Sequence, residues 1–267
     1  MAEAQLHQSE DEILRRVFPI LGNYLHRRHY LQTVNLPAFT PSKRRFLYMK
    51  NHKCACTTVL ATLMTHLQRE AGTEHEFDMD TVHTPPKSLL LTGPRGLTLP
   101  MVDRAIHDDR VFKFTIVREP VARTVSAFAD KIVKGDKQKA KLMNYLGRPK
   151  TSDITLSEFL DIMAHDEGAR DVDRHWREQR KEVSYDFIPF DFIGDMADLN
   201  GAMTFAIQEI FGETPQLQDT RTSLGHKSRS RELIEGMTAQ DHRNIETAFG
   251  PDFEMYEEVK TRLEEAA

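Results

Sequence analysis

Two short polar turns in this sequence carry residues that suit the binding of anions. The first begins at Lys53 and includes Thr57 and Thr58, and the second begins at Arg118 and reaches Ser126. Each turn follows a short apolar run and opens a segment with helical spacing of apolar residues. Backbone N–H groups at the start of a helix, with Lys, Arg and hydroxyl groups beside them, favour phosphate. The pair therefore predicts one site for a nucleotide that is phosphorylated at both its 5′ and 3′ ends.

The first turn lies between a predicted strand and a predicted helix. Residues 46–49 are all apolar, and apolar residues then recur at helical spacing: Val59, Leu60, Leu63, Met64 and Leu67. Ala55 is small enough for an anion to approach the backbone closely, and Lys53 supplies a mobile positive charge. Thr57 and Thr58 offer both a helix cap and hydroxyl donors. An ordinary strand-to-helix turn, with a threonine cap and a solvated lysine, is the alternative interpretation.

The second turn has the same organisation. Residues 111–117 are predicted to form a buried strand that ends at Arg118, and Pro120 suits the first turn of a helix. The core-facing stripe of that helix is expected to be Val121, Val125, Phe128 and Ile132. Arg118 and Ser126 can converge on one anion, because open α/β sheets bind ligands beyond the carboxyl ends of their strands. Arg123 fits equally well as a surface residue.

The residues of the two turns resemble those of a known family, the sulfotransferases that use 3′-phosphoadenosine 5′-phosphosulfate (PAPS). The first turn resembles the family's 5′-phosphosulfate loop through Lys53, Ala55, Thr57 and Thr58. The second resembles its 3′-phosphate motif through Arg118, Pro120, Arg123, Ser126 and Phe128. Residues 116–120, 173–179 and 192–195 are similar to the carbohydrate branch that includes the chondroitin and HNK-1 enzymes. The resemblance extends from residue 46 to residue 256.

Two positions depart from the family pattern. His52 precedes the loop lysine where family members commonly have proline, and Glu119 stands where aspartate is commoner. Neither change removes an anion donor. The Golgi members of the family also carry a transmembrane anchor and additional cysteines, neither of which occurs in this sequence, so a bacterial-type member is expected.

The resemblance implies an α/β fold with three layers, α/β/α, around a central and mainly parallel sheet similar to that of P-loop NTPases. One sulfotransferase domain is expected over residues 1–267, with residues 1–40 as a helical N-terminal extension and 46–256 as the family-like core. The co-substrate is expected to be PAPS and the product adenosine 3′,5′-bisphosphate. The implied nucleotide-binding residues are Lys53, Ala55, Cys56, Thr57, Thr58, Arg118, Ser126 and Lys227. Lys227 belongs to a segment near which, in the family, a loop closes over the nucleotide.

Sulfuryl transfer is an in-line displacement that needs charge stabilisation on the leaving oxygen and a base for the acceptor hydroxyl. Lys53 is the candidate for the first role, and no metal is required in principle. His83 is the preferred base, because it stands before a Pro-Pro turn at a position from which related sulfotransferases present a catalytic histidine. The alternatives for the base are His175, His52, Glu119 and Asp130.

The two cysteines, Cys54 and Cys56, both lie in the first turn. Residues two positions apart are poor disulfide partners, and a zinc site needs two further ligands that the neighbourhood does not provide. Both are therefore expected to line the loop as thiols, with their N–H groups facing the phosphate.

Composition excludes some classes of protein. The formal net charge is −5, which argues against a general nucleic-acid binder. No run approaches the roughly 18 apolar residues of a membrane helix, and the acidic N-terminus does not resemble a signal peptide, so a cytoplasmic enzyme is expected. One segment is basic, with Lys131, Lys134, Lys137, Lys139, Lys141, Arg148 and Lys150. It is either a solvated loop or a rim that attracts an acidic saccharide acceptor.

The remaining segments give coarser predictions. A helix capped by Thr155 or Ser157 is expected near residues 156–163, and a polar loop or exposed helix over 171–184 around Trp176, which is more often a core residue than a sugar platform. Residues 187–194 suggest a strand. The helix that follows is expected to end at Gly212, and another, over 238–263, to be broken at Gly250-Pro251.

Two other functions stay open. A nucleotide or small-molecule kinase of the P-loop type is disfavoured, because the Walker pattern places glycine before the lysine and the first turn has no glycine. A non-catalytic protein that binds PAPS or a saccharide would carry the same anion-binding turns. The sequence specifies neither the acceptor nor the oligomeric state.

Overall fold

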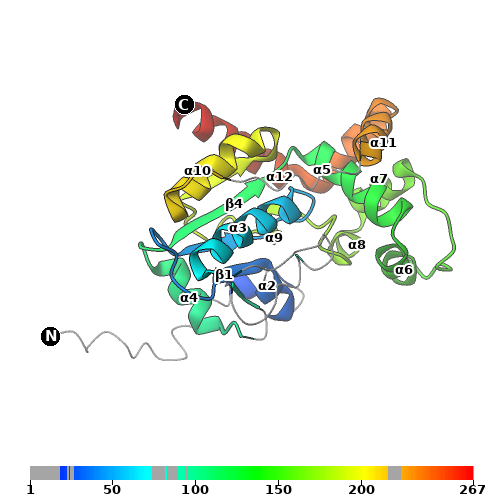
Figure 1. Cartoon of the computed structure of the whole chain (residues 1–267). Helices are drawn as coiled ribbons and strands as arrows, with labels where there is room; N and C mark the ends of the chain where they lie inside the picture. The colour runs from blue at the N-terminus through cyan, green and yellow to red at the C-terminus, as the bar shows by residue number, and fades with distance from the viewer. Residues whose placement is uncertain are drawn as a thin grey trace.

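The computed structural model describes residues 19–22, 24, 27–73, 82, 90–93, 96–215 and 224–266. Within them a sheet lies between two layers of helices (Figure 1). Its strands are β1 Val34–Pro37, β2 Phe46–Met49, β3 Leu91–Thr92, β4 Phe112–Val117 and β5 Phe192–Asp195, in the order β3-β1-β2-β4-β5. The three-layer α/β arrangement agrees with the expectation from the sequence.

The expectation of a mainly parallel sheet was wrong. The pairs β2–β4 and β4–β5 are parallel, but β1 is antiparallel to both β2 and β3. The short segment between β1 and β2 contains no crossover helix, and parallel neighbours need one. The parallel half of the sheet is the half that precedes the two anion-binding turns.

Alternation along the strands divides the core between the two faces of the sheet. Phe46, Tyr48 and Phe114 pack on one face with α3 Cys56–Ala71 and α10 Leu199–Phe211. Leu47, Met49 and Val117 pack on the other face with α4 Leu99–His107 and the C-terminal α12 Ala239–Ala266. Because both faces are covered, β2 and β4 are buried along their whole length. This explains the apolar sequence of β2 and the predominance of apolar residues in β4, whose exceptions are Lys113 and Thr115.

The close approach of α10 to the sheet depends on one glycine. A Cβ atom placed on Gly194 of β5 would lie 2.6 Å from the Cβ of Ala202 and 2.8 Å from Cδ1 of Ile116. No side chain fits there without moving the helix. The helix α10 then ends at Gly212, which has φ 72, as the sequence predicted.

A third group of helices lies beyond the carboxyl end of β4 (Figure 1). It is formed by α5 Pro120–Ala127, the π-helical turn Phe128–Val133, α6 Asp136–Tyr145, α7 Leu156–His165, α8 Glu167–Asp171 and α11 Leu224–Glu235. Trp176 is fully buried among them and donates its Nε1–H to the carbonyl of Ala169 at 3.0 Å, so it is a core residue as predicted. Thr155 caps α7 through the N–H of Glu158, one of the two predicted caps.

Residues 171–184, predicted to be a polar loop or an exposed helix, contain several turns, but none of these residues is exposed. The segment contains the short helix α9 Gln179–Glu182, and Arg177, Gln179 and Glu182 are buried. Gln179 bonds to Asn51 and Arg118, and Glu182 faces His29 and His52, all distant in sequence. Arg177 pairs with Asp171 and Glu182 within the segment. Of the strand predicted over 187–194, only the end forms β5, because residues 184–190 close turns through Phe187 N–H to Ser184 O and Phe190 N–H to Ile188 O.

The remaining elements are α2 Arg27–Thr33 and the 3₁₀ turn Met196–Asp198. The long helix α12 is kinked at Phe249, just before Gly250-Pro251, as the sequence predicted. Within the described part of the chain, no helix is both long and apolar enough to cross a membrane.

Candidate functional site

The two predicted anion-binding turns meet at one edge of the sheet. The parallel neighbours β2 and β4, paired at Tyr48 and Phe114, end side by side, so the turns that follow them are adjacent. The Arg118 guanidinium donates to the carbonyl of Lys53 at 3.1 Å, and Arg123 donates through Nε to the carbonyl of His52 at 3.1 Å. The structure therefore brings Lys53 and Arg118 together, as one shared site requires.

The first turn is built from backbone in the left-handed region. Lys53 has φ 68 and Ala55 has φ 55, conformations that cost a residue with a Cβ on the order of 1–3 kcal/mol each. Left-handed residues between right-handed ones point successive N–H groups into a concave cradle, a geometry that binds anions. The local strain is consistent with a binding role for this turn.

The predicted threonine cap of α3 was wrong. The helix begins at Cys56, and its N-cap is Ala55, which has no side-chain oxygen to accept a hydrogen bond. Thr57 and Thr58 lie instead in the first helical turn. A cap without its own acceptor suits a helix start that binds an external anion.

The second turn opens α5 with Pro120 at its first position, as predicted. The carboxylate of Glu119 accepts the N–H groups of Val121 at 2.9 Å and of Ala122 at 2.7 Å, so this alternative base serves as the cap of α5. Arg123 is 1% exposed and so is not a surface residue. Ser126 is half-buried on the same helix.

Lys53, the predicted catalytic cation, is held by an aspartate. Its Nζ lies 2.8 Å from Oδ2 of Asp130, and the same oxygen lies 3.0 Å from Nζ of Lys131. Burial acts to raise the pKa of Asp130, but Lys53 and Lys131 outweigh it and hold that pKa well below its usual range. Asp130 is thus ionised, and its carboxylate is paired with the lysine that a phosphosulfate group would need. Burial lowers the pKa of Lys53, and Asp130 opposes this effect.

His175 lies beside this cluster. Its Nδ1 is 2.5 Å from Oδ1 of Asp173, whose other oxygen accepts a 2.6 Å hydrogen bond from Lys141. The ring packs edge-on against that of His52, with centroids 4.8 Å apart. Burial lowers the pKa of His175, Asp173 opposes this, and the charges of Lys131 and Lys53 lower it further.

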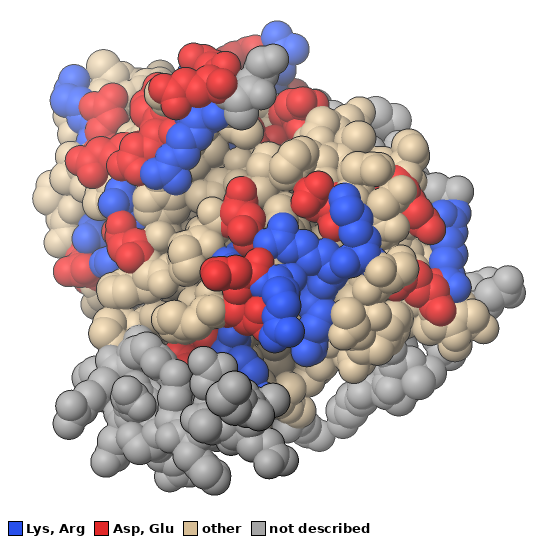
Figure 2. Space-filling model, turned by 90° about the vertical axis from the view of Figure 1, so that its left-hand side faces the viewer, with Lys and Arg blue, Asp and Glu red and all other residues tan. Residues whose placement is uncertain are grey.

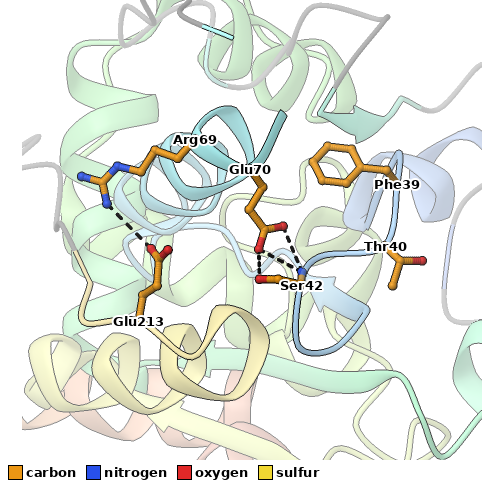
Figure 3. Close-up of a pocket in the computed structure, with 6 residues that line it drawn as sticks. All are labelled: Phe39, Thr40, Ser42, Arg69, Glu70 and Glu213. Carbon is orange, nitrogen blue, oxygen red and sulfur yellow. Dashed lines mark hydrogen bonds and ion pairs between the residues drawn. The ribbon is translucent and has the colours of Figure 1, made fainter. Parts of the chain in front are cut away.

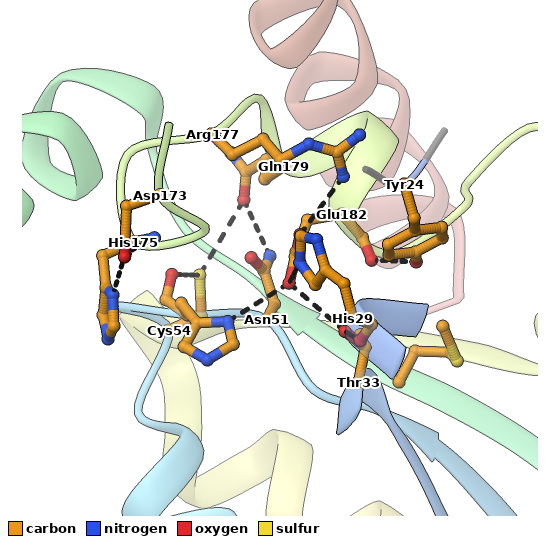
Figure 4. A network of polar contacts seen from close by, with 12 residues as sticks. Tyr24, His29, Thr33, Asn51, Cys54, Asp173, His175, Arg177, Gln179 and Glu182 are labelled. Carbon is orange, nitrogen blue, oxygen red and sulfur yellow. Dashed lines mark hydrogen bonds and ion pairs between the residues drawn. The ribbon is translucent and has the colours of Figure 1, made fainter. Parts of the chain in front are cut away.

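His52 is buried and faces Glu182, with Nδ1 3.3 Å from Oε1. Glu182 is fully buried, and Oε2 also lies 3.1 Å from Nε2 of His29 and 3.2 Å from Arg177 (Figure 4). Burial lowers the pKa of His52 well below its usual value, against the pull of Glu182. Because His52 is enclosed in this network, it supports the loop from behind rather than facing a substrate.

One amide side chain joins the two turns. The Oε1 of Gln179 accepts Nδ2–H of Asn51 at 3.0 Å and the backbone N–H of Arg118 at 3.3 Å, and Nε2 donates to the Arg118 carbonyl at 2.8 Å. Figure 4 shows the side chain of Gln179, which begins the same helix as Glu182, directed toward Asn51. Sequence reasoning did not find this role. The available signal was the polar run 173–179 that resembles the family, but its polarity was read as exposure.

Both cysteines are buried free thiols. Cys54 Sγ lies 3.8 Å from the Gln179 oxygen and 3.7 Å from the His52 carbonyl. Burial raises the pKa of the Cys54 thiol to about 12, so it stays protonated and donates. Among the described residues, no group of three or more His, Cys, Asp and Glu side chains has metal-binding geometry.

Two predicted residues cannot be placed. His83, the preferred base, lies outside the described residues. Lys227 falls in α11, but its side chain also lies outside the described part, so its contact with a nucleotide stays a prediction.

The basic segment 131–150 is partly neutralised. Its ion pairs join Lys131 to Asp130, Lys139 to Asp153, Lys141 to Asp173 and Arg148 to Glu158. The ion pair between Lys141 and Asp173 joins α6 to the residue that is hydrogen-bonded to His175. The segment is therefore part of the wall of the site and not a detached solvated loop.

The opposite end of the sheet, where the parallel strands begin, carries mixed charge. Figure 2 shows Lys and Arg side chains gathered beside Asp and Glu on this side of the molecule. Arg44 and Lys113 lie 3.6 and 3.5 Å from Asp191, and Lys43 lies 3.3 Å from Glu209. These ion pairs offset part of the positive charge that the described residues place at this end.

A shallow depression also lies at this end, at the last turn of α3 (Figure 3). Its carboxylates are engaged, since Glu70 accepts the N–H of Ser42 at 2.9 Å and Glu213 lies 3.7 Å from Arg69. The anion-binding turn is at the first turn of α3, about 20 Å away along the helix axis at 1.5 Å per residue. The depression is thus separate from the site.

Comparison with known proteins adds one finding. A model described as "Sulfotransferase family" matches residues 37–257, which includes both turns and the segment that carries Asp173, His175 and Gln179. No curated protein and no solved structure matches the chain.

Proposed function

Because the chain belongs to the sulfotransferase family, as the match over residues 37–257 shows, we propose that it transfers a sulfuryl group from PAPS to a carbohydrate hydroxyl. The observation that carries this proposal is the meeting of the two turns, through the 3.1 Å hydrogen bond from Arg118 to the Lys53 carbonyl. The distance between the two phosphates of a 3′,5′-phosphorylated nucleotide is fixed by its ribose, so a site for it needs two anion cradles at a set spacing.

The residues present fit such a donor. The left-handed backbone at Lys53 and Ala55 and the start of α3 form a cradle for the 5′-phosphosulfate. Arg118, from the second turn, and Ser126, from α5, are the residues that we assign to the 3′-phosphate. The N-cap without its own acceptor and the half-buried cation at Arg118 match the chemistry of a polyanion.

Lys53 is the residue that we assign to the leaving group. Its ammonium is paired with Asp130, and in the proposed complex with the donor the phosphosulfate oxygens replace that carboxylate. Its charge is needed most when the bridging oxygen becomes negative in the transition state. Lys131 remains beside Asp130 at 3.0 Å and compensates its charge when Lys53 leaves.

A carbohydrate acceptor is favoured by two observations. The segments 116–120, 173–179 and 192–195 are similar to the carbohydrate branch, and the basic helix α6 is attached to the site through Lys141 and Asp173. Cations along this wall favour an acidic saccharide. A P-loop kinase holds magnesium with an aspartate at the end of a strand. Asp195 ends β5, but its carboxylate already accepts hydrogen bonds from the Tyr256 hydroxyl and from the N–H of Ala197. No observation in the described residues therefore favours a kinase.

The test is incubation of the purified protein with PAPS labelled in its sulfuryl group and a panel of neutral and acidic glycans. We expect label in a glycan, with an equal amount of adenosine 3′,5′-bisphosphate released, without Mg²⁺. Consumption of ATP with Mg²⁺ in place of PAPS would refute the proposal. Tight binding of the bisphosphate with no transfer to any acceptor would instead identify a non-catalytic binding protein.

A further inference from the structure

We propose that His175, oriented by Asp173, takes the proton from the acceptor hydroxyl; this inference rests on the proposed sulfuryl transfer. The sequence favoured His83 for this role and named His175 as an alternative. The geometry of the described residues gives an independent argument for His175, from its hydrogen bonds, its exposure and its neighbours.

One ring nitrogen of His175 is available to accept a proton. Nδ1 of His175 lies 2.5 Å from Oδ1 of Asp173, and the same oxygen accepts the backbone N–H of His175 at 3.2 Å. Asp173 is ionised, because His175 and Lys141 outweigh the effect of burial and keep its pKa below the usual range. An ionised carboxylate accepts, so Nδ1 carries the ring proton and Nε2 presents a lone pair. This is the tautomer that a general base needs.

The neighbours of His175 hold its ring in place. Asp173 is 5% exposed, and its second oxygen is held by Lys141 of α6 at 2.6 Å. The imidazole also packs in a T-shaped contact against the ring of His52, whose Nδ1 lies 3.3 Å from Oε1 of Glu182. A base whose ring is fixed on two sides is aligned before the substrate arrives, which lowers the cost of reaching the transition state.

His175 lies near the turn that begins at Lys53 and is partly exposed to solvent. The His175 side chain is 18% exposed, so an edge of the ring reaches solvent. Lys53 and Lys131 are close enough to act on its charge, and His52, the ring neighbour of His175, immediately precedes Lys53 in the chain. The base therefore lies on the rim of the cradle that would hold the transferable group.

The other buried histidines of the described chain do not combine an oriented ring with an edge that reaches solvent. His29 and His52 both face Glu182 in the interior. His66 is paired with Glu213 in the last two turns of α3, far from Lys53. Each of these side chains is less than 10% exposed and cannot meet a saccharide hydroxyl directly.

The charged groups around His175 also favour its neutral form. Burial lowers its pKa, Asp173 raises it, and Lys131 and Lys53 lower it again, with the net result below the usual value. The remaining neighbours are Lys141, which reaches Asp173, and His52, whose own pKa burial depresses. His175 is thus unprotonated at neutral pH and able to accept a proton.

As the acceptor oxygen forms its bond to sulfur, the hydroxyl proton moves to Nε2 of His175. The bond between sulfur and the bridging oxygen breaks, and its electron pair remains on that oxygen of adenosine 3′,5′-bisphosphate, beside Lys53. The resulting imidazolium faces the Asp173 carboxylate and later releases its proton to solvent.

The test compares His175→Gln with the wild type in the transfer assay across pH. We expect kcat to fall by about a hundredfold or more, within the range for loss of a general base, while bisphosphate affinity changes less than about twofold. We also expect the wild-type rate to rise with pH along an acid limb that the variant lacks. Asp173→Asn should move that limb to lower pH, because removing the carboxylate lowers the pKa of His175 further.

The matched control is His165→Gln at the end of α7, where the side chain is 69% exposed and pairs with Asp161. It should leave rate and pH profile unchanged. His83→Asn separates the two candidates. A His175→Gln enzyme that keeps its rate and its acid limb overturns the inference, and so does loss of that limb only in His83→Asn. A wild type without any sulfuryl transfer refutes the proposed function instead.

Discussion

The substitution Gln179→Leu tests the idea that one buried amide sets the spacing of the two anion-binding turns. Leucine has a similar size but cannot hydrogen-bond, so the N–H and the carbonyl of Arg118 both lose their Gln179 partner. Asn51 keeps a bond from Nδ2 to the Ile116 carbonyl at 3.1 Å. Each buried group left unsatisfied costs about 1–3 kcal/mol, so the free energy of unfolding should fall by about 2–6 kcal/mol.

The functional effect should be larger for a ligand that uses both turns than for one that uses a single turn. We expect the preference for adenosine 3′,5′-bisphosphate over AMP to fall by about tenfold, equivalent to about 1.4 kcal/mol, because the second turn is no longer fixed relative to the first. Urea denaturation measures the stability change, and titration calorimetry at a temperature where the variant is folded measures the two affinities.

The control for this experiment is Gln240→Leu on α12, where the side chain is exposed and bonds to Asn244 one turn away. It should change neither quantity by more than about 0.5 kcal/mol. If Gln179→Leu is destabilised but keeps the full preference for the bisphosphate, Gln179 supports the fold without setting the spacing of the turns, and the reasoning is refuted.

Three further predictions concern Lys53, its partner and the buried histidines. Lys53→Ala should lower kcat by about a hundredfold or more with little change in KM, because its charge acts mainly in the transition state; steady-state kinetics with an unchanged kcat would show a ground-state role only. Asp130→Asn should raise affinity for the bisphosphate severalfold, since Lys53 loses a competing carboxylate at 2.8 Å, and calorimetry showing weaker binding would instead make Asp130 a residue that positions the lysine. The folded-state pKa of His52 is depressed, so its contribution to stability is present above about pH 6.5 and is lost as pH falls. Urea denaturation between pH 7.5 and 5.5 should show this loss, at up to about 1.4 kcal/mol per pH unit for each proton taken up on unfolding, and His52→Gln should flatten the slope.

The elements that the sequence predicted well are those determined by neighbours along the chain. The strand before Lys53, the strand before Arg118 and the glycine end of α10 each follow from apolar runs or from one residue's backbone preference. The convergence of the two turns was also predictable, because parallel strands place their carboxyl ends at the same edge.

What could not be predicted depends on partners distant in sequence. Gln179 and Glu182 read as part of a polar loop or exposed helix, yet both are buried. The hydrogen bonds of Glu182 come from α2, and those of Gln179 come from Asn51 and from the end of β4. Polarity alone does not distinguish a surface segment from a satisfied internal network. The left-handed N-cap at Ala55 was likewise hidden, because alanine rarely adopts that conformation without surrounding contacts that enforce it.

The central claim is that the two turns form one site for a 3′,5′-phosphorylated nucleotide. The most direct test is titration calorimetry of the wild type and Arg118→Ala with adenosine 3′,5′-bisphosphate and with AMP, without Mg²⁺. We predict that the wild type binds the bisphosphate at least about tenfold more tightly, and that Arg118→Ala loses about 1.5–3 kcal/mol for the bisphosphate and little for AMP. Equal affinities of the wild type for the two nucleotides would contradict the claim.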